Sequence, residues 1–260
     1  METQLDMISI DGRVFTLFAI DIGNSAIKLY SKGVYFHFSY KLEWQASLKQ
    51  LLSSLDKQHT LFVISSVNPE KEADLQKIIS LYSNFTILQV KTLIQNQKIV
   101  NTEKIQGIGN DRLLGLIGGL NYFDAPLITV DMGTATTVNY LDENKFAQGG
   151  AILPGVFTQF RSLIEHTSAL KGIKLTNDIG TIGTNTNQAI SSGIVNGMYG
   201  TVSYFINTIR TETKQNLPVI LTGGNSNWIS EKLLSTFQPI KQVPTLVLEG
   251  ITFLTKTHFS

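Results

Sequence analysis

The chain contains no cysteine among its 260 residues, so neither a disulfide bond nor a thiolate nucleophile can take part in its chemistry. This absence fits a reducing compartment, and we expect a cytoplasmic protein. An excess of one charge is also missing, because 21 Lys and Arg stand against 20 Asp and Glu. The near balance gives no reason to expect a nucleic acid or an acidic membrane surface as a partner.

Long hydrophobic runs are absent as well. The longest apolar stretch, residues 113–120, is far shorter than the roughly 20 residues that cross a bilayer. The first residues include Glu2, Asp6 and Asp11 and lack the basic start of a signal peptide, which argues against a secreted protein. Residues 1–12 are expected to be a loose leader. The chain is long enough for one large domain or two small ones with a hydrophobic core.

Several signatures of known catalytic classes do not occur in the sequence. There is no G-x-x-x-x-G-K-[ST], which excludes a P-loop kinase. There is no G-x-S-x-G, which argues against a serine hydrolase. The four histidines lack the spacing of metal ligands and are expected to lie at the surface or in the core: His37, His59, His166 and His258.

One pattern does occur, and it occurs twice. Residues 17–30 and 127–140 each form an apolar strand that ends in Asp-x-Gly and small polar residues, followed by more strand-like sequence. Asp21 and Asp131 share a register, as do the glycines two positions later. A single Asp-x-Gly is typical of an ordinary hairpin whose Asp bonds the turn backbone. The repetition favours two phosphate-binding turns, because glycine lets backbone N–H groups approach an anion and the carboxylate can hold a cation.

The order of the predicted elements repeats together with this motif. The first half is expected to have strands at 14–20, 25–31 and 34–40, then a helix at 42–56, a strand at 60–66, a helix at 70–83 and a strand at 85–90. After Pro126 we expect strands at 127–130, 135–141 and 145–152, helices at 156–170 and 187–212, a strand at 218–222, and helices at 226–236 and 245–257. The sequence therefore predicts an α/β fold of two duplicated ribonuclease H-like domains, residues 1–125 and 126–260, whose two turns face each other across a cleft.

Between the two copies lies Gly109-Asn110-Asp111-Arg112, which opens an apolar run predicted to be a helix. A carboxylate at this position can simply cap the exposed N–H groups of the helix. Beside a phosphate site, the Asp111 carboxylate next to the Arg112 guanidinium also suits a general base with substrate anchoring. Both interpretations of the segment stay open.

Three glycine-containing segments could also contact a ligand. Gly149–Gly155 and Thr222–Gly224 each follow a strand, and each is either a common turn or a place of close backbone approach to a nucleotide. Gly183–Thr186 precedes a long helix, for which Thr186 is the predicted N-cap. That helix carries Gly193, Gly197 and Gly200, a spacing that would let another helix or a nucleotide pack closely.

Together these motifs resemble the type III pantothenate kinases of the acetate kinase, sugar kinase, Hsp70 and actin superfamily. The resemblance runs from about residue 16 to residue 255 and rests on four segments: Asp21–Lys28, Gly109–Arg112, Asp131–Thr137 and Gly149–Gly155. Ser65–Pro69 and Gly183–Thr186 add weaker agreement. The resemblance implies that the two halves are actin-like ATPase domains flanking a nucleotide cleft. It also implies ATP-dependent phosphorylation of pantothenate to 4′-phosphopantothenate, the first step of coenzyme A biosynthesis.

The resemblance also implies roles for individual residues. ATP phosphates would lie against the following residues: Asp21, Ile22, Gly23, Asn24, Ser25, Ala26, Ile27, Lys28 and Thr134. Pantothenate would contact Gly109, Asn110, Asp111, Arg112 and Thr186, with Asp111 as the base on its hydroxyl. Asp131 matches the ligand of a monovalent cation, K⁺ or NH₄⁺, and Mg²⁺ would offset phosphate charge. The family implies a homodimer, and Lys28 either contacts phosphate or faces solvent.

The sequence departs from the family at a few positions. Thr102 and Ile105 stand where a Tyr and a Pro are usual, and Lys171 where a Pro is common, changes that bear on pantothenate affinity. Two alternative functions stay open: a kinase for another small hydroxyl substrate, and a non-catalytic regulator similar to the Bvg accessory factors. The intact Asp21, Asp111 and Asp131 argue against the non-catalytic alternative.

Overall fold

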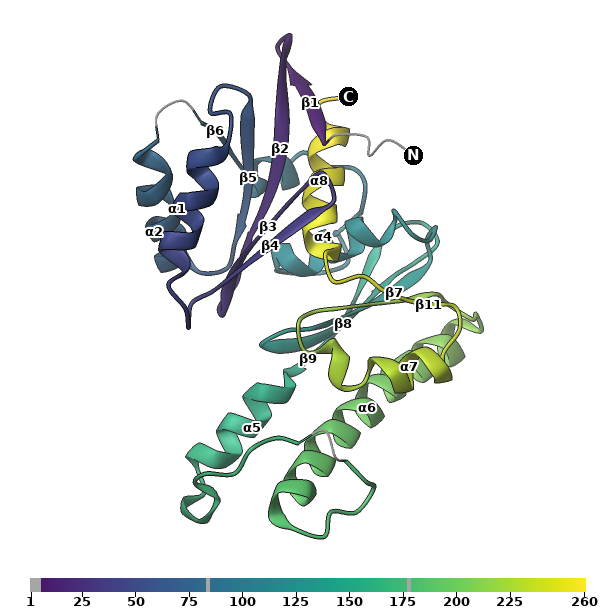
Figure 1. The fold of residues 1–260 in the computed structure, drawn as a ribbon. Helices are drawn as coiled ribbons and strands as arrows, with labels where there is room; N and C mark the ends of the chain where they lie inside the picture. Colours follow the sequence, from purple (N-terminus) through teal and green to yellow (C-terminus); the bar gives the residue numbers. More distant parts are fainter. Residues whose placement is uncertain (1–5, 83–84, 177–178) are drawn as a thin grey trace. The chain divides into compact units, whose positions relative to one another are not determined.

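The computed structural model describes residues 6–82, 85–176 and 179–260, which form two compact units (Figure 1). Unit 1 comprises Met1–Asn101, Gly107–Tyr122 and Thr245–Ser260, and unit 2 comprises Thr102–Gln106 and Phe123–Pro244. The chain therefore leaves unit 1 and returns to it twice. No helix among the described residues is long and apolar enough to cross a membrane.

Unit 1 is built on a mixed sheet with the strand order β4-β3-β2-β5-β6 and with β1 added to β2. Its strands are β1 (Met7–Ile10), β2 (Arg13–Ile22), β3 (Ala26–Ser31), β4 (Val34–Ser39), β5 (Thr60–Ser66) and β6 (Thr86–Gln89). Strand β2 runs antiparallel to β3 and parallel to β5. Because the second half of β2 is covered on both faces, residues 17–20 form a continuous apolar run, and Asp21 follows directly after it.

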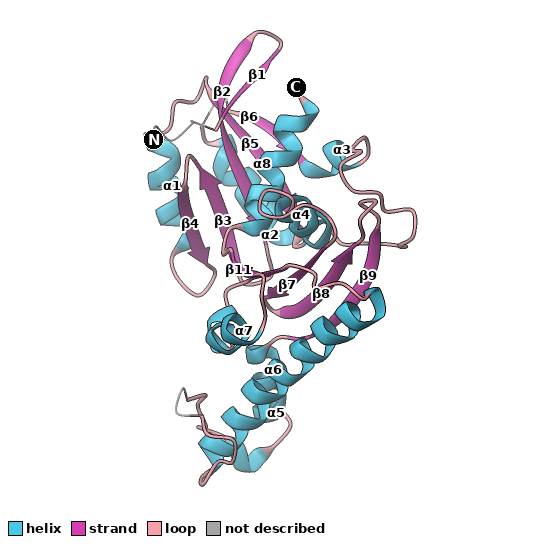
Figure 2. Ribbon diagram, turned by 90° about the vertical axis from the view of Figure 1, so that its right-hand side faces the viewer, coloured by secondary structure: helices cyan, strands magenta, loops and turns pink. Residues whose placement is uncertain are grey.

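Two sets of helices cover the sheet of unit 1 (Figure 2). On one face, α1 (Trp44–Ser54) and α2 (Pro69–Ser80) bury Phe18, Ile20 and Ile22 of β2 in a hydrophobic cluster. The helices α3 (Val90–Ile94), α4 (Asn110–Gly119) and α8 (Leu246–His258) pack against β2, β3 and β5 as well. Because side chains alternate along a strand, Asp21 points to the face opposite that of Ile20.

Unit 2 repeats this plan with the strand order β11-β10-β7-β8-β9. Its strands are β7 (Leu127–Met132), β8 (Ala135–Leu141), β9 (Ala147–Pro154), β10 (Val219–Thr222) and β11 (Ile240–Gln242). Its helices are α5 (Val156–Glu165), α6 (Thr186–Thr213) and α7 (Ser230–Thr236), with short 3₁₀ turns at Ser168–Leu170 and Ser226–Trp228. The two sheets match when β7 stands for β2 and β10 for β5, which confirms the predicted duplication.

The structure corrects several predicted elements. The leader predicted at 1–12 contains β1, which pairs with β2 from Met7 to Ile10; residues 1–5 lie outside the described part. The short strand β11 and the short helix α3 were not predicted, because three to five residues carry too little periodicity. The helix predicted at 156–170 ends at Glu165 and continues only as a 3₁₀ turn. The end of the helix predicted at 70–83 also lies partly outside the described residues.

Two further differences concern the second half of the chain. The division at 125/126 placed the last helix in the second half, but α8 packs against α4 and β2 and belongs to unit 1. The N-cap of α6 is Asn185, whose side chain accepts a hydrogen bond from the Gln188 N–H at 3.0 Å, so Thr186 is the first helical residue. The glycines of α6 approach no other backbone among the described residues, since a Cβ on any of them would meet no atom within 4 Å: Gly193, Gly197 and Gly200.

Candidate functional site

The first Asp-x-Gly forms the turn between β2 and β3. Gly23 N–H donates to the Ala26 carbonyl at 3.0 Å, which closes a turn of four residues. Asp21 lies opposite Lys28 on β3, and its carboxylate is 3.5 Å from the Lys28 ammonium. Lys28 is therefore placed at ion-pair distance from Asp21, an arrangement that neither sequence interpretation of this lysine included.

Asp21 sits in an unfavourable environment for a negative charge. Its side chain is buried, and burial raises the pKa of its carboxyl above the usual range. Lys28 acts in the opposite direction, while the charge of Asp111 raises the pKa further. A buried carboxylate that one lysine does not fully compensate is suited to meet another cation.

Ser65 is a residue of this site that the sequence indicated only weakly, through the Ser65–Pro69 segment. It lies beside Asp21 in the parallel pairing of β2 with β5 and is buried. Its hydroxyl is among the buried side-chain atoms for which the described residues supply no hydrogen-bond partner. A buried hydroxyl without a partner is costly, so a polar ligand that reached this edge of the sheet would gain a hydrogen bond from Ser65.

Asp111 lies in the first turn of α4, whose N-cap is Gly109. Its carboxylate accepts a hydrogen bond from the Arg112 N–H at 2.8 Å, so the expected interaction with the helix N-terminus is present. A Cβ on Gly109 would lie 2.6 Å from Asp111 Oδ1. The absence of a side chain at Gly109 therefore leaves the space that the Asp111 carboxylate occupies. The negative charge of Asp111 raises the pKa of Asp21, so the two carboxylates belong to one electrostatic site within unit 1.

The second Asp-x-Gly forms the turn between β7 and β8 in unit 2. Gly133 N–H donates to the Ala135 carbonyl at 2.9 Å, which closes a turn one residue shorter than the first. Asp131 is half-buried and lies beside Thr222 in the pairing of β7 with β10, the position that Ser65 has beside Asp21. Thr134 is exposed within the turn.

Gly223 leaves room for the Asp131 carboxylate. It has a φ of +92°, and a Cβ there would lie 2.5 Å from Asp131 Oδ1. This contact gives the Thr222–Gly224 segment a structural role beside the second turn. Thr186, the other predicted site residue of unit 2, begins α6 and is exposed, and it is not part of this turn.

No cluster of three or more His, Cys, Asp or Glu suited to hold a metal ion occurs among the described residues. A divalent ion that arrives with a nucleotide usually takes only one or two carboxylates from the protein, its other ligands being phosphates and water. Asp21 and Asp131 fit that requirement, each as a single carboxylate at the end of a strand.

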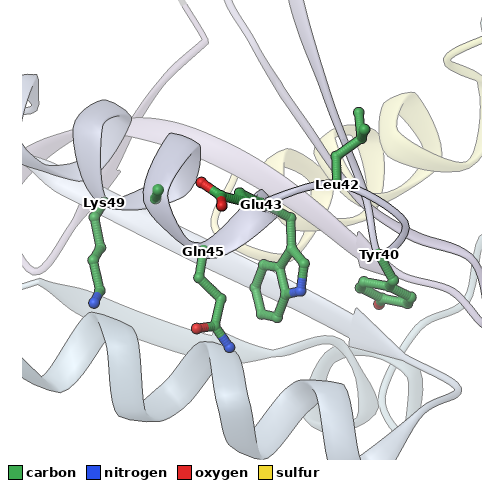
Figure 3. A pocket seen from close by; sticks show the side chains of 7 residues that line it. Tyr40, Leu42, Glu43, Gln45 and Lys49 are labelled. Carbon is green, nitrogen blue, oxygen red and sulfur yellow. The ribbon is translucent and has the colours of Figure 1, made fainter.

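A surface hollow of about 380 Å³ lies where β4 leads into α1 (Figure 3). It is lined by Tyr40, Leu42, Glu43, Trp44, Gln45, Ala46 and Lys49. None of the residues predicted from the sequence to bind a ligand lines it. Tyr40 connects the hollow to the first turn, because its hydroxyl donates to the Gly23 carbonyl at 3.0 Å.

Solved structures with this fold include a conserved putative Baf family transcriptional activator from Campylobacter jejuni. It is 19% identical with a TM-score of 0.61, and the match covers 93% of this chain and 98% of that one. An archaeal actin homolog is 11% identical with a TM-score of 0.54 and coverages of 93% and 99%. At these identities the likeness shows the fold alone, and it confirms the predicted pair of actin-like domains.

Sequence comparison identifies the family of this chain in addition to its fold. A family model described as type III pantothenate kinase matches residues 17–208. A type III pantothenate kinase of Sulfurihydrogenibium sp. (strain YO3AOP1) is 34% identical over 193 residues, which are 74% of this chain and 75% of the relative. The resemblance drawn from the motifs is thereby confirmed, and the chain belongs to the type III pantothenate kinase family, whose enzymes phosphorylate pantothenate with ATP in coenzyme A biosynthesis.

Proposed function

We propose that Asp111 is the general base of this kinase and accepts the proton of the primary hydroxyl of pantothenate. The observation that carries the proposal is the fixed position of its carboxylate, bonded to Arg112 N–H at 2.8 Å above a glycine that leaves it space. As the proton moves to Asp111, the hydroxyl oxygen forms a bond to the γ-phosphorus and the bond to the β-phosphate oxygen breaks. The products are 4′-phosphopantothenate and ADP.

We assign the phosphates of ATP to the two turns. Residues Asp21–Lys28 and Thr134 would supply backbone N–H groups and, from Lys28, one positive charge. Mg²⁺ bound with the nucleotide would offset phosphate charge near Asp21. The buried and incompletely compensated Asp21 carboxylate supports this role, because a cation would relieve its desolvation.

We assign pantothenate to Gly109, Asn110, Asp111 and Arg112, with Thr186 as a further contact. The Arg112 guanidinium suits a carboxylate group of the substrate, since it offers planar paired donors. Thr102 and Ile105 belong to a segment whose Lys104 ammonium lies 3.5 Å from the Asp142 carboxylate. We expect the two unusual residues to change pantothenate affinity more than phosphoryl transfer.

Three further features complete the proposal. Asp131 would hold a monovalent cation, the protein would work in the cytoplasm, and it would be a homodimer. The dimer is proposed from the family, and a second copy that packed on unit 2 would remove exposed apolar side chains from water: Ile152, Phe157, Leu163, Ile182 and Tyr204. The predicted halves 1–125 and 126–260 remain our description of the duplicated sequence, with α8 contributing to unit 1.

The decisive experiment for the substrate is a comparison of hydroxyl acceptors. Purified protein with ATP should release ADP when pantothenate is added, and mass spectrometry should detect 4′-phosphopantothenate. Sugars and hydroxy acids serve as competing acceptors in parallel reactions. A faster reaction with one of these than with pantothenate would favour the alternative kinase function, and no reaction with any acceptor would favour the regulator.

A further inference from the structure

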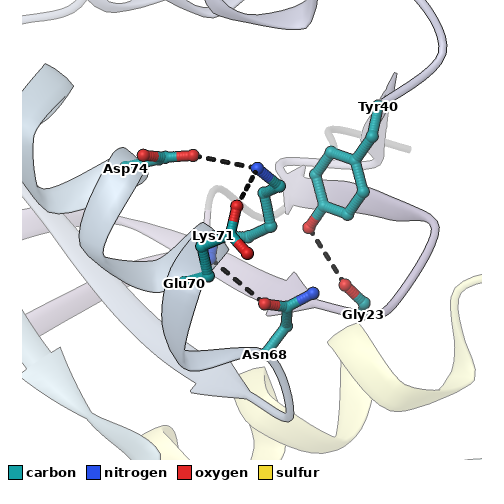
Figure 4. A network of polar contacts seen from close by, with 6 residues as sticks. All are labelled: Gly23, Tyr40, Asn68, Glu70, Lys71 and Asp74. Carbon is teal, nitrogen blue, oxygen red and sulfur yellow. Dashed lines mark hydrogen bonds and ion pairs between the residues drawn. The ribbon is translucent and has the colours of Figure 1, made fainter.

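In each unit, the carbonyl of the Asp-x-Gly glycine accepts a hydrogen bond from a side chain outside the repeated motif. The Tyr40 hydroxyl donates to the Gly23 carbonyl at 3.0 Å (Figure 4). The Asn225 side-chain amide donates to the Gly133 carbonyl at 2.8 Å. Tyr40 follows β4 whereas Asn225 follows β10, so the two donors do not correspond in the duplicated topology. The same contact is therefore made by different residues from different places.

These contacts determine where the next N–H group points. A peptide unit is planar and trans, so its C=O and N–H point in opposite directions. With the Gly23 carbonyl directed at Tyr40, the Asn24 N–H points away from Tyr40. With the Gly133 carbonyl directed at Asn225, the Thr134 N–H points away from Asn225. Asn24 and Thr134 are residues that we assign to the phosphates of ATP.

A second carbonyl of each turn is held as well. The Tyr40 N–H donates to the Ser25 carbonyl at 3.2 Å. In unit 2, the Thr134 carbonyl accepts from the Gly155 N–H at 2.9 Å and from the Thr158 hydroxyl at 2.6 Å. Both turns are thus restrained at two successive or nearby carbonyls, which limits rotation of the peptide units between them.

The ring of Tyr40 is itself held in place. The Lys71 ammonium lies 5.6 Å from the ring centroid, and the Trp44 ring meets it edge-on with centroids 5.7 Å apart. Lys71 is bonded to Glu70 at 2.9 Å and to Asp74 at 3.0 Å (Figure 4). Burial raises the pKa of Tyr40, and nearby carboxylates raise it further, so the hydroxyl remains protonated and able to donate.

We propose that Tyr40 and Asn225 are positioning residues that aim the N–H groups of Asn24 and Thr134 at the phosphates of ATP, an inference that rests on the proposed role of the two turns. Donors that are already oriented bind an anion without the cost of ordering them at the moment of binding. Neither residue belongs to the motifs that define the turns.

Removal of one donor group tests each contact. Tyr40→Phe keeps the ring and removes the hydroxyl, and we expect the Kd of a non-hydrolysable ATP analogue and the KM for ATP to rise about 5- to 10-fold. The KM for pantothenate should not change. Tyr82→Phe is the matched control, because the Tyr82 hydroxyl also donates to a backbone carbonyl of unit 1, that of Lys49 at 3.1 Å. For unit 2, Asn225→Ala is compared with Asn196→Ala, whose amide donates to the Gly180 carbonyl at 3.2 Å.

Amide NMR of the full-length protein supplies a readout that a merely structural role would not move. In the wild type, the Asn24 and Thr134 N–H resonances should shift when the analogue is added, and Tyr40→Phe should reduce the Asn24 shift at saturation. Nucleotide affinity and Asn24 shifts equal to those of the Tyr82→Phe control, with only the melting temperature altered, would overturn the positioning role. Wild-type protein that binds the analogue without a shift at either N–H would instead overturn the assignment of phosphates to the turns, and the inference with it.

Discussion

Gly118 of α4 and Gly250 of α8 lie directly against each other in unit 1. A Cβ on Gly118 would lie 3.0 Å from Gly250 N and closer still to the Leu246 carbonyl oxygen. A Cβ on Gly250 would lie 3.2 Å from Gly118 N and would overlap the Leu114 carbonyl. The last helix of the chain therefore reaches this position only because neither residue has a side chain, and α4 carries Asp111 at its opposite end.

The close approach predicts a loss of stability in Gly118→Ala. Because the added methyl group meets backbone atoms that cannot rotate away, we expect the free energy of unfolding to fall by about 1–3 kcal/mol. Gly115→Ala is the control in the same helix, since a Cβ there meets nothing within 4 Å. Urea denaturation of both variants measures the effect, and equal stability of the two would contradict the described contact.

Asp21→Asn should stabilise the free protein at neutral pH while weakening ATP binding. The pKa of Asp21 is raised in the folded state. At pH values between the ordinary Asp pKa of 3.8 and the raised value, the folded protein therefore binds more protons than the unfolded chain. The contribution of Asp21 to stability therefore falls as the pH rises through this interval. The neutral amide lacks the ionisation cost, and its advantage should shrink as the pH is lowered toward 4.

The control for this pH dependence is a carboxylate whose pKa is lowered in the folded state rather than raised. The pKa of the exposed Asp56 is lowered, chiefly by its hydrogen bond with His59 at 2.9 Å, so Asp56→Asn should not stabilise the protein. Melting temperatures of both variants at pH 5 and pH 8, without nucleotide, decide the matter. An Asp21→Asn variant less stable than the wild type at pH 8 would show that the Asp21 charge is favourable in the fold.

Asp111→Asn should retain the fold and lower kcat by about 10²–10⁴-fold, the usual contribution of a general base. Gly109→Ala should also lower kcat, by up to about 10²-fold, because the new methyl group displaces the Asp111 carboxylate. Steady-state kinetics, with circular dichroism to check folding, measures both. Near-native turnover in Asp111→Asn would remove this residue from the mechanism.

Turnover should rise with K⁺ or NH₄⁺ and be weak in Na⁺ alone if Asp131 holds a monovalent cation. Asp131→Ala should abolish this dependence. Gly223→Ala should weaken it, since a Cβ there would press on Asp131 Oδ1 from 2.5 Å. Initial rates at constant ionic strength in the three chloride salts provide the measurement. Equal rates in all three salts for the wild type would argue against the assignment.

The protein should be a homodimer in dilute solution, with a mass twice the 28.7 kDa of the chain. Light scattering coupled to size exclusion gives the mass directly. Tyr204→Lys would introduce a charge on α6 at a side chain that is 63% exposed, and it should weaken the dimer if this surface is covered by the second copy. A fully active monomer would refute the assembly.

Elements whose signals are local could be predicted from the amino-acid sequence. The repeated Asp-x-Gly pattern predicted the positions of both turns. An apolar run that ends in a glycine-containing turn depends on residues that are neighbours in the chain. The same regularity revealed the duplication and, with Gly109–Arg112, the family. It also predicted most helices and strands, although it missed β1, β11 and α3, whose four, three and five residues are too few for a periodic signal.

Contacts between residues far apart in the chain depend on the complete fold. Tyr40 and Gly23 are 17 residues apart and Asn225 and Gly133 are 92 apart, and no periodicity connects residues at such separations. The same holds for α8, whose apolar pattern predicts a helix but not the surface on which it packs. The raised pKa of Asp21 also follows from burial, and burial is a property of the whole fold around a residue rather than of its neighbours in the chain.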